Sequence, residues 1–159
     1  MGKDLTSALR PAIVMTVLFA VLLGLAYPLA MTGIAQVLFP RQAGGSLVER
    51  DGTVVGSALI GQAFTRDGYL HPRPSAAGDG YDASASSGSN LGPLNPDLAE
   101  RVRTEADALR TETGAAIIPA DAVTTSASGL DPHISPAYAG LQAARVAQAR
   151  GVSVEQVQA

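Results

Sequence analysis

The sequence predicts a single N-terminal transmembrane helix followed by a small α+β extracytoplasmic domain. Three observations support this fold class: a long uncharged apolar run near the N-terminus, an Asp-Gly turn signal between two β-prone segments, and two well-punctuated helix signals in the second half. We therefore divide the 159 residues into a cytoplasmic leader at 1–10, a transmembrane helix at 11–40 and an extracytoplasmic domain at 41–159.

The transmembrane helix is predicted from the 30 residues between Pro11 and Pro40, none of which is charged. About 20 apolar residues cross the hydrocarbon core of a bilayer, whereas a secretory signal peptide uses an apolar region of only ~7–15 residues. The length therefore favours an uncleaved anchor over a cleaved signal. The basic residues on the two sides discriminate weakly, but the short leader with Lys3 and Arg10 favours a cytoplasmic N-terminus, and everything after Arg41 then lies outside.

Small side chains recur at intervals of four along the transmembrane helix and so lie along one stripe. One interpretation is close packing against another transmembrane helix, and the other is the ordinary richness of membrane helices in alanine and glycine. Because proline lacks a backbone N–H group, the last residue of the stripe is expected to kink the helix or end its regular part. The stripe consists of Ala12, Thr16, Ala20, Gly24 and Pro28.

A β-hairpin is predicted at the start of the extracytoplasmic domain. Residues 47–50 and 53–55 flank Asp51-Gly52, a pair that suits a type I′ turn with positive φ at both central residues. The half-apolar segment 57–64 is expected to continue as extended chain.

Residues 72–93 are rich in glycine, proline and serine, and Tyr81 and Leu91 are their only large apolar side chains. This composition favours a flexible linker. The alternative is an ordered loop that folds over a partner or ligand, since loops longer than ~12–15 residues are usually functional or disordered. Tyr81 and Leu91 are the residues that would then fasten the loop.

Two helices are predicted from their end signals. Asn95-Pro96 begins the first helix, which ends near Gly114, and Ser135-Pro136 begins the second, which ends near Gly151. Between them, residues 117–118 and 122–125 are expected to supply a short strand.

A third helix is predicted from the capping box formed by Ser153 and Gln156. The chain stops three residues later, at Ala159, and a helix of about one turn is not stable by itself. We therefore expect the domain to be cut short at its C-terminus.

Several chemistries are disfavoured by composition. The chain has no cysteine and a net charge of −3, so neither a thiolate site nor a nucleic-acid-binding surface is expected. It has no phosphate-binding loop of the G-x-x-x-x-G-K-[ST] type. The only histidines, His71 and His133, lie 62 residues apart, so no metal site is expected.

Two other functions remain open on the residues alone. One is a membrane-anchored extracytoplasmic serine hydrolase that would use Ser128, Asp131 and His133, although the nucleophile motif G-x-S-x-G is absent. The other is a free-standing anchored binding module. We expect no catalytic residue.

Two turn-rich stretches, residues 86–93 and 126–135, each precede a predicted helix. Ordinary capping explains part of them. Their backbone N–H groups and hydroxyl oxygens are also suited to contact a partner or an anion. The candidate partner-contact residues are Ser87, Gly88, Ser89, Asn90, Ser126, Ser128, Gly129, Asp131 and His133.

Several short motifs in the sequence are distinctive, and the most specific is the run from Val123 to Ser135. The others are Gly61-Gln62-x-Phe64, Arg73-Pro74-Ser75-Ala76, Tyr81-Asp82, Ser89-Asn90-Leu91-Gly92-Pro93 and Gln142-x-x-Arg145-Val146-Ala147-x-Ala149-Arg150. In these motifs, which extend over almost its whole length, the sequence resembles the KdpC family. The family turn usually has glycine where this chain has Ser87. If that position needs a positive φ, the serine costs about 1 kcal/mol.

The resemblance implies a non-catalytic accessory subunit of the bacterial high-affinity potassium-transporting ATPase. It implies a hetero-oligomer in the bacterial inner membrane, with a channel-like potassium-translocating subunit, a P-type ATPase subunit and a small one-helix subunit. The subunit would stabilise assembly and cover the outer potassium entrance. It would also act as a catalytic chaperone that raises the ATP affinity of the ATPase subunit. No intrinsic cofactor is implied, because ATP and potassium are handled by the complex.

Overall fold

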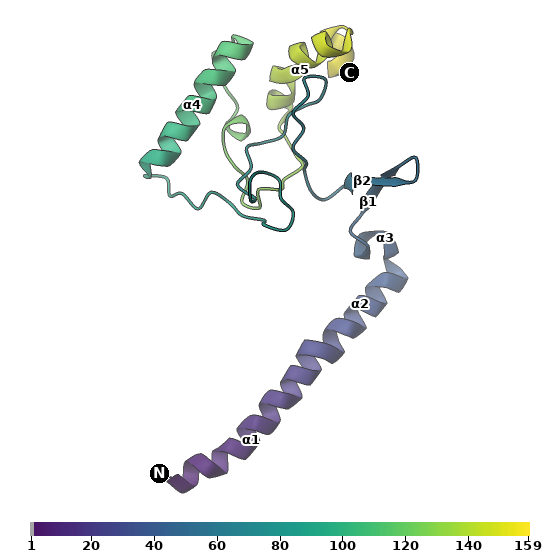
Figure 1. Cartoon of the computed structure of the whole chain (residues 1–159), viewed down its shortest axis with the longest axis vertical. Coiled ribbons are helices and arrows are strands. Elements are labelled where there is room, and N and C mark those ends of the chain that lie inside the picture. Colours follow the sequence, from purple (N-terminus) through teal and green to yellow (C-terminus); the bar gives the residue numbers. More distant parts are fainter. Residues whose placement is uncertain (1) are drawn as a thin grey trace. The chain divides into compact units, whose positions relative to one another are not determined.

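The structure is a computed structural model that describes residues 2–159 (Figure 1). It has two compact units, which divide between Leu47 and Val48. The first unit is mainly one long helix, and the second is a small domain of three helices, a 3₁₀ turn and a two-stranded sheet. The predicted fold class, a long apolar N-terminal helix followed by a small α+β domain, is confirmed.

The long helix consists of α1 (Gly2–Val21), a π-helical turn η1 (Leu22–Ala26) and α2 (Tyr27–Leu38). Its segment Thr6–Leu38 is long and apolar enough to cross a membrane. The helix begins before the predicted boundary at Pro11, since a single proline removes only one backbone donor and lies inside α1. After a break at Phe39, a short helix α3 (Pro40–Ala43) follows.

The predicted disturbance at Pro28 takes the form of the π turn η1. The Tyr27 N–H group donates to the Leu22 carbonyl, five residues back, rather than to the fourth. A proline ring would clash with the carbonyl of Gly24 in a regular α-helix, and the wider turn makes room for it. The regular four-residue spacing of the small-residue stripe therefore holds only from Ala12 to Ala20, and packing of the stripe against another helix stays a prediction.

The predicted hairpin is present in the second unit. Strands β1 (Leu47–Arg50) and β2 (Thr53–Ser57) form the sheet, and Asp51 and Gly52 have φ angles of 53° and 76°, as a type I′ turn requires. The extended segment expected at 57–64 is wrong. The chain turns after Ser57, because the Leu59 N–H group donates to the Ser57 hydroxyl (3.1 Å) and so closes a tight turn.

Helix α4 (Pro96–Thr113) has the predicted ends. Its first turn is capped by Asn95, whose side-chain oxygen accepts from the Asp97 N–H group (2.8 Å), and it ends at Gly114 with φ 69°. The strand predicted after it is wrong. A 3₁₀ turn η2 (Ala120–Ala122) stands there instead. It is favoured because proline at 119 cannot donate to a β-ladder and the Thr124 hydroxyl donates back to the Ala120 carbonyl (2.7 Å).

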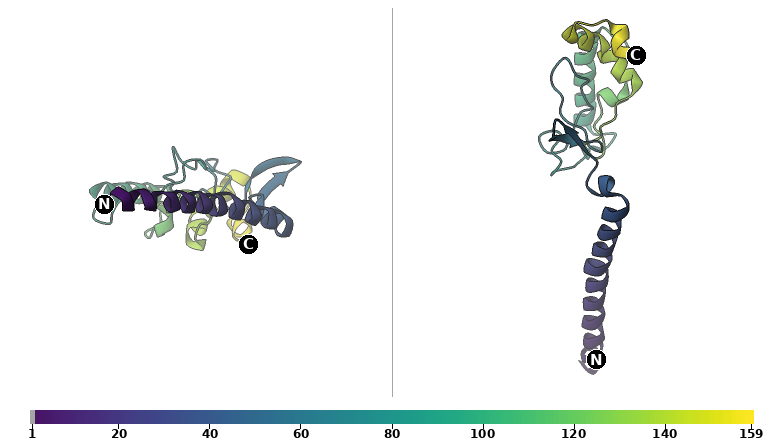
Figure 2. Two further views of the ribbon diagram at one scale, coloured as in Figure 1. Left: turned by 90° about the horizontal axis from the view of Figure 1, so that it is seen from below. Right: turned by 90° about the vertical axis from the view of Figure 1, so that its right-hand side faces the viewer.

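Helix α5 (Pro136–Arg150) also has the predicted ends, at the Ser135 cap and at Gly151 with φ 66°. The capping box of Ser153 and Gln156 opens α6 (Val154–Gln158), as predicted. Helix α6 packs beside the end of α5 in both figures (Figures 1 and 2).

The core of the domain is small and lies where α4, η2 and α5 meet. Because its side chains are mostly short, it buries little apolar surface for a domain of this length, and polar contacts carry much of the packing between segments. Its buried members are Ala106, Ala122, Val123 and Tyr138, with Val102, Leu109, Ile118, Ile134 and Leu141 packed against them.

Candidate functional site

The candidate partner-contact residues lie on two loops, residues 72–93 and 123–135, which we call the paired loops. They cross and bond to each other. The Ser87 N–H group donates to the Ser128 carbonyl (3.0 Å), and the Ser75 hydroxyl donates to the Gly129 carbonyl (2.6 Å). Ala77, in the middle of the first loop, is 0% exposed. The expectation of a flexible linker at 72–93 is therefore wrong, because serine hydroxyls and backbone groups bind this loop to its neighbour.

Gly129 stands at the crossing point of the paired loops. A Cβ atom at this position would lie 2.6 Å from the Ser87 carbonyl oxygen and 2.7 Å from the Ala77 nitrogen, and its φ is 68°. Both the space and the backbone angle thus require glycine. Within residues 2–159, Ser87 is not among the residues with a positive φ. In the serine-rich turn of the first loop, the residue with a positive φ is Asn90, at 53°. The cost considered for Ser87 therefore does not arise.

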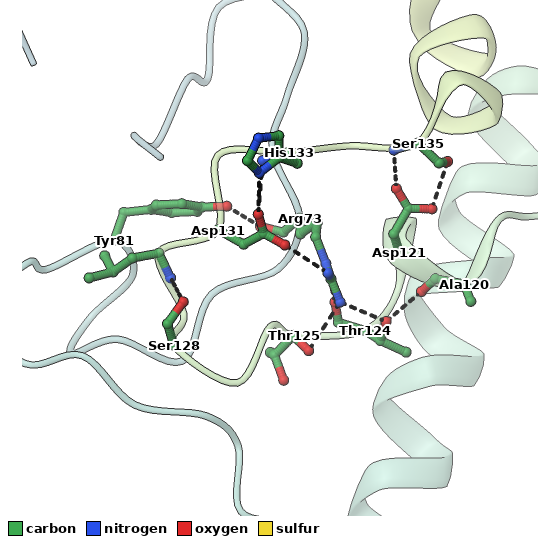
Figure 3. Close-up of polar contacts among 11 residues, drawn as sticks. Arg73, Tyr81, Ala120, Asp121, Thr124, Thr125, Ser128, Asp131, His133 and Ser135 are labelled. Carbon is green, nitrogen blue, oxygen red and sulfur yellow. Dashed lines mark hydrogen bonds and ion pairs between the residues drawn. The ribbon is translucent and has the colours of Figure 1, made fainter. Parts of the chain in front are cut away.

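An ion pair between Arg73 and Asp131 joins the paired loops (Figure 3). Arg73 Nη1 donates to Asp131 Oδ2 (3.0 Å), and the same guanidinium reaches the carbonyls of Thr124 and Thr125 at 3.4 Å. The other Asp131 oxygen accepts from the His133 N–H group (3.0 Å). This backbone hydrogen bond is the main cause that lowers the pKa of Asp131, with smaller contributions from the His133 and Arg73 side chains. Asp131 therefore holds the loops together as a carboxylate.

The three residues of the hydrolase alternative do not form a catalytic triad. His133 Nδ1 lies 3.1 Å from Asp131 Oδ1, but the His133 side chain is 88% exposed. The Ser128 hydroxyl accepts from the Leu130 N–H group (3.1 Å), and within the described residues 2–159 it has no hydrogen bond to His133. Ser128 thus stabilises a local turn, and the geometry gives the hydrolase alternative no support.

Two further contacts fasten the paired loops. The Tyr81 hydroxyl donates to the Arg73 carbonyl (2.8 Å), so this tyrosine does fasten its loop, and burial raises its pKa. Asp121 receives both the N–H group (2.7 Å) and the hydroxyl (2.9 Å) of Ser135 (Figure 3). The start of α5 is therefore attached to η2, which sequence spacing did not indicate.

The candidate residues differ in their accessibility. Ser126 is buried, whereas Asn90 and His133 are exposed and available to a partner. In the part of the chain that the structure describes, no three histidine or acidic side chains are placed to hold a metal ion.

Sequence analysis missed a second cluster, which we call the α5 latch: Gln142, Arg145 and Arg150. The Gln142 amide accepts from the His71 N–H group (2.7 Å) and donates to the His71 carbonyl (3.1 Å), so it pairs with the main chain as a neighbouring strand would. Gln142 is only 5% exposed. Burial is tolerated because each polar end of the amide has a partner.

The two arginines of the α5 latch bind carbonyls of the same loop. Arg145 Nη1 donates to the Asp67 carbonyl (2.8 Å) and, more weakly, to that of Tyr69 (3.3 Å), while Arg150 Nε donates to the Gly68 carbonyl (2.6 Å). Arg145 also donates to the Gln142 side-chain oxygen (2.6 Å). The three-residue spacing of Gln142 and Arg145 on one helix face was the available signal, since it placed a polar pair beside buried apolar positions.

Together, these features define a class: a membrane-anchored protein whose small α+β domain displays loops fixed by internal hydrogen bonds. A family model described as KdpC, the c chain of the K+-transporting ATPase, matches residues 9–159. The potassium-transporting ATPase KdpC subunit of Caulobacter sp. (strain K31) is 70% identical over 154 residues, which are 96% of this chain and 79% of the relative. The KdpC subunit of Beijerinckia indica is 65% identical, over 94% of this chain and 77% of the relative. The KdpC subunit of Myxococcus xanthus is 60% identical, over 99% of this chain and 74% of the relative. The chain belongs to the KdpC family.

Proposed function

We propose that the chain is a non-catalytic accessory subunit of a potassium-transporting ATPase, which stabilises the assembly and covers its outer potassium entrance. The observation that carries this proposal is the family match, which includes the anchor, the paired loops and the α5 latch. The geometry is in keeping with this proposal, because the charged groups of Arg73, Asp131 and Arg145 form hydrogen bonds within their own domain and so stabilise its loops.

The partners in this proposal are a channel-like potassium-translocating subunit, a P-type ATPase subunit and a small one-helix subunit. The apolar segment Thr6–Leu38 anchors the chain once in the bacterial inner membrane, with the N-terminus in the cytoplasm and the domain outside. The chain brings no cofactor of its own, and ATP and potassium bind to the other subunits.

The proposal includes a role as a catalytic chaperone that raises the affinity of the ATPase subunit for ATP. ATP is cytoplasmic, whereas the orientation proposed above puts the domain on the opposite side of the membrane. The effect on ATP affinity therefore passes through contacts between subunits and not through nucleotide bound to this domain. The chaperone role is tested by measuring the KM for ATP of the complex with and without this chain. The KM should be higher when the chain is missing.

The subunit proposal is tested by purifying the tagged chain from its native membranes in mild detergent and quantifying what accompanies it by mass spectrometry. A P-type ATPase and a channel-like subunit in near-equal amounts are expected. Purification of the chain alone, under conditions that preserve other membrane complexes, would contradict the proposal and favour the free-standing binding module.

The orientation is tested with single cysteines, because the chain has none of its own. A cysteine at the exposed Ser84 should react with a membrane-impermeant maleimide in intact inner-membrane spheroplasts, whereas one at Asp4 should react only after permeabilisation. The reverse pattern would place the domain in the cytoplasm.

A further inference from the structure

The loop that the α5 latch holds displays an apolar surface. The rings of Phe64 and Tyr69 stack with centroids 5.6 Å apart, yet each side chain is 45% exposed, and Leu70 beside them is 39% exposed. Phe64 and Leu70 also line a groove of about 390 Å³ whose other walls include Val48 and Ile134. We call Phe64, Tyr69 and Leu70, together with the bordering Arg66 and Arg150, the aromatic patch. Exposed aromatic and arginine side chains of this kind are typical centres of protein interfaces.

The loop that carries the aromatic patch contains no helix or strand, but hydrogen bonds attach it to α5. Gln142 pairs with the main chain of His71, and Arg145 and Arg150 bind the carbonyls of Asp67 and Gly68. A surface fixed before binding loses little conformational entropy when a partner docks. A fluid lipid surface gains nothing from such a fixed shape, whereas a protein segment does.

The charges at the border of the aromatic patch indicate the chemistry of the partner. The residues after Pro40 carry 9 arginines and 13 acidic residues, so the region is acidic overall. The side chain of the exposed Arg66 nevertheless has no ion pair or hydrogen bond within the described residues, and Arg150 lies over the Tyr69 ring at 5.6 Å without a carboxylate partner. By contrast, Arg145 lies 3.5 Å from a carboxylate oxygen of Glu112. In the described part of the chain, neither Arg66 nor Arg150 has a carboxylate partner, and the guanidinium nitrogens that remain free can bind one.

From these observations we infer that the aromatic patch binds a protein segment in which an apolar side chain stands next to a carboxylate, on another subunit of the pump. The apolar side chain packs on the Phe64–Tyr69 pair, and the carboxylate binds Arg66 or Arg150. This inference rests on the proposed function, because it requires that the chain works inside a multi-subunit assembly.

The test uses full-length chains produced together with the other subunits and purified in an uncharged detergent over a series of salt concentrations. Arg66→Glu should weaken retention of the other subunits about tenfold at low salt, and less at high salt, because it reverses one rim charge. Tyr69→Ala should weaken retention about tenfold at all salt concentrations, because it removes an aromatic anchor. Thermal unfolding of each purified chain checks folding, and Arg66→Glu removes no internal contact.

Matched controls carry the same changes elsewhere on the domain. Arg103→Glu reverses an exposed arginine of α4, and Ile117→Ala removes an apolar side chain that is 85% exposed. Both should retain the other subunits as the unmodified chain does.

The outcomes separate the inference from the proposed function. If the unmodified chain brings no other subunit, the proposed function fails. If it does, but Arg66→Glu and Tyr69→Ala retain the partners equally well, the aromatic patch is not the contact. If the variants differ from the unmodified chain only in nanodiscs that contain anionic lipid, a lipid surface occupies the patch, and the inference is equally overturned.

Discussion

Helices α4 and α5 begin and end in the same way but contribute very differently to the domain. Each starts with a proline after a capping side chain and ends at a glycine with positive φ. Helix α5 nevertheless buries five side chains, whereas α4 buries only Ala106. The comparison shows that capping residues set where a helix starts and stops. The side chains between the caps decide how much of the helix is buried in the core.

Polar contacts follow the same division. On α5, Gln142 and Arg145 give every buried polar atom of the latch a partner. On α4, Arg101 Nε and Glu105 Oε1 are 4.0 Å apart, and buried nitrogen and oxygen atoms of both side chains have no hydrogen-bond partner within the described chain. Burial therefore raises the pKa of Glu105 despite the opposing charge of Arg101. Among the described residues, the buried polar atoms without hydrogen-bond partners therefore lie on α4.

The largest effect is expected for a substitution at Gly129, where the paired loops cross. Gly129→Ala should lower the free energy of unfolding by about 3 kcal/mol or more, because the added Cβ collides with backbone atoms at a positive φ. Urea unfolding of the purified chain in detergent measures it. As the matched control, Gly140→Ala on α5 meets no atom within 4 Å and should stabilise the chain by about 0.5–1 kcal/mol. Similar unfolding curves for the two variants would refute the crossing argument.

The next effect tests the α5 latch. Gln142→Ala should cost about 2–3 kcal/mol, because it leaves the partly buried N–H and carbonyl groups of His71 without their partner. Hydrogen exchange should show the amide of His71 losing protection. Val146→Ala, a core truncation on the same helix, should cost about 2 kcal/mol without selectively exposing that amide. The latch would be unimportant if Gln142→Ala behaved like the exposed Gln148→Ala.

A third prediction concerns the pH dependence of stability that arises from the Arg73–Asp131 ion pair between the paired loops. The pKa of Asp131 is lowered in the folded chain, so its contribution to stability is complete above the unfolded value of about 3.9 and is lost as the pH falls through the folded value. Asp131→Asn should therefore be less stable than the unmodified chain at pH 7. The difference should vanish in acid, which urea unfolding between pH 2 and pH 7 measures. A constant difference over this range would contradict the carboxylate role.

The smallest effect has the opposite sign and lies on α4. The pKa of Glu105 is raised by burial, so the folded state disfavours its charged form, and its contribution to stability decreases as the pH rises past about 4.3 towards the folded value. Glu105→Gln should therefore raise the free energy of unfolding at pH 7, by less than about 1 kcal/mol because the partly exposed site is screened by solvent. A loss of stability would show that the pair with Arg101 is stronger than its 4.0 Å separation indicates.

The sequence allowed the anchor, the hairpin turn and all three helix caps of the domain to be predicted, because each depends on a few adjacent residues. The strand expected at 122–125 and the flexible linker expected at 72–93 were wrong for a shared reason. Both segments are shaped by hydrogen bonds to distant groups, such as that from Ser75 to Gly129, which no local pattern reveals. The α5 latch was missed likewise, although its residues stood in a motif that carried the family resemblance.

The α5 latch also determines the order in which the domain can fold during synthesis. His71 is separated from Gln142 by 71 positions, and Gly68 from Arg150 by 82. At ~5–20 residues per second, a ribosome needs about 4–16 s to add those 82 residues. During that interval the hairpin can form, since its contacts are local, but the loop at 67–71 has nothing to bind. The main chain of this loop therefore lacks its hydrogen-bond partners on α5 for seconds, which is the period in which a chaperone or a co-translated partner subunit would protect the new chain from aggregation.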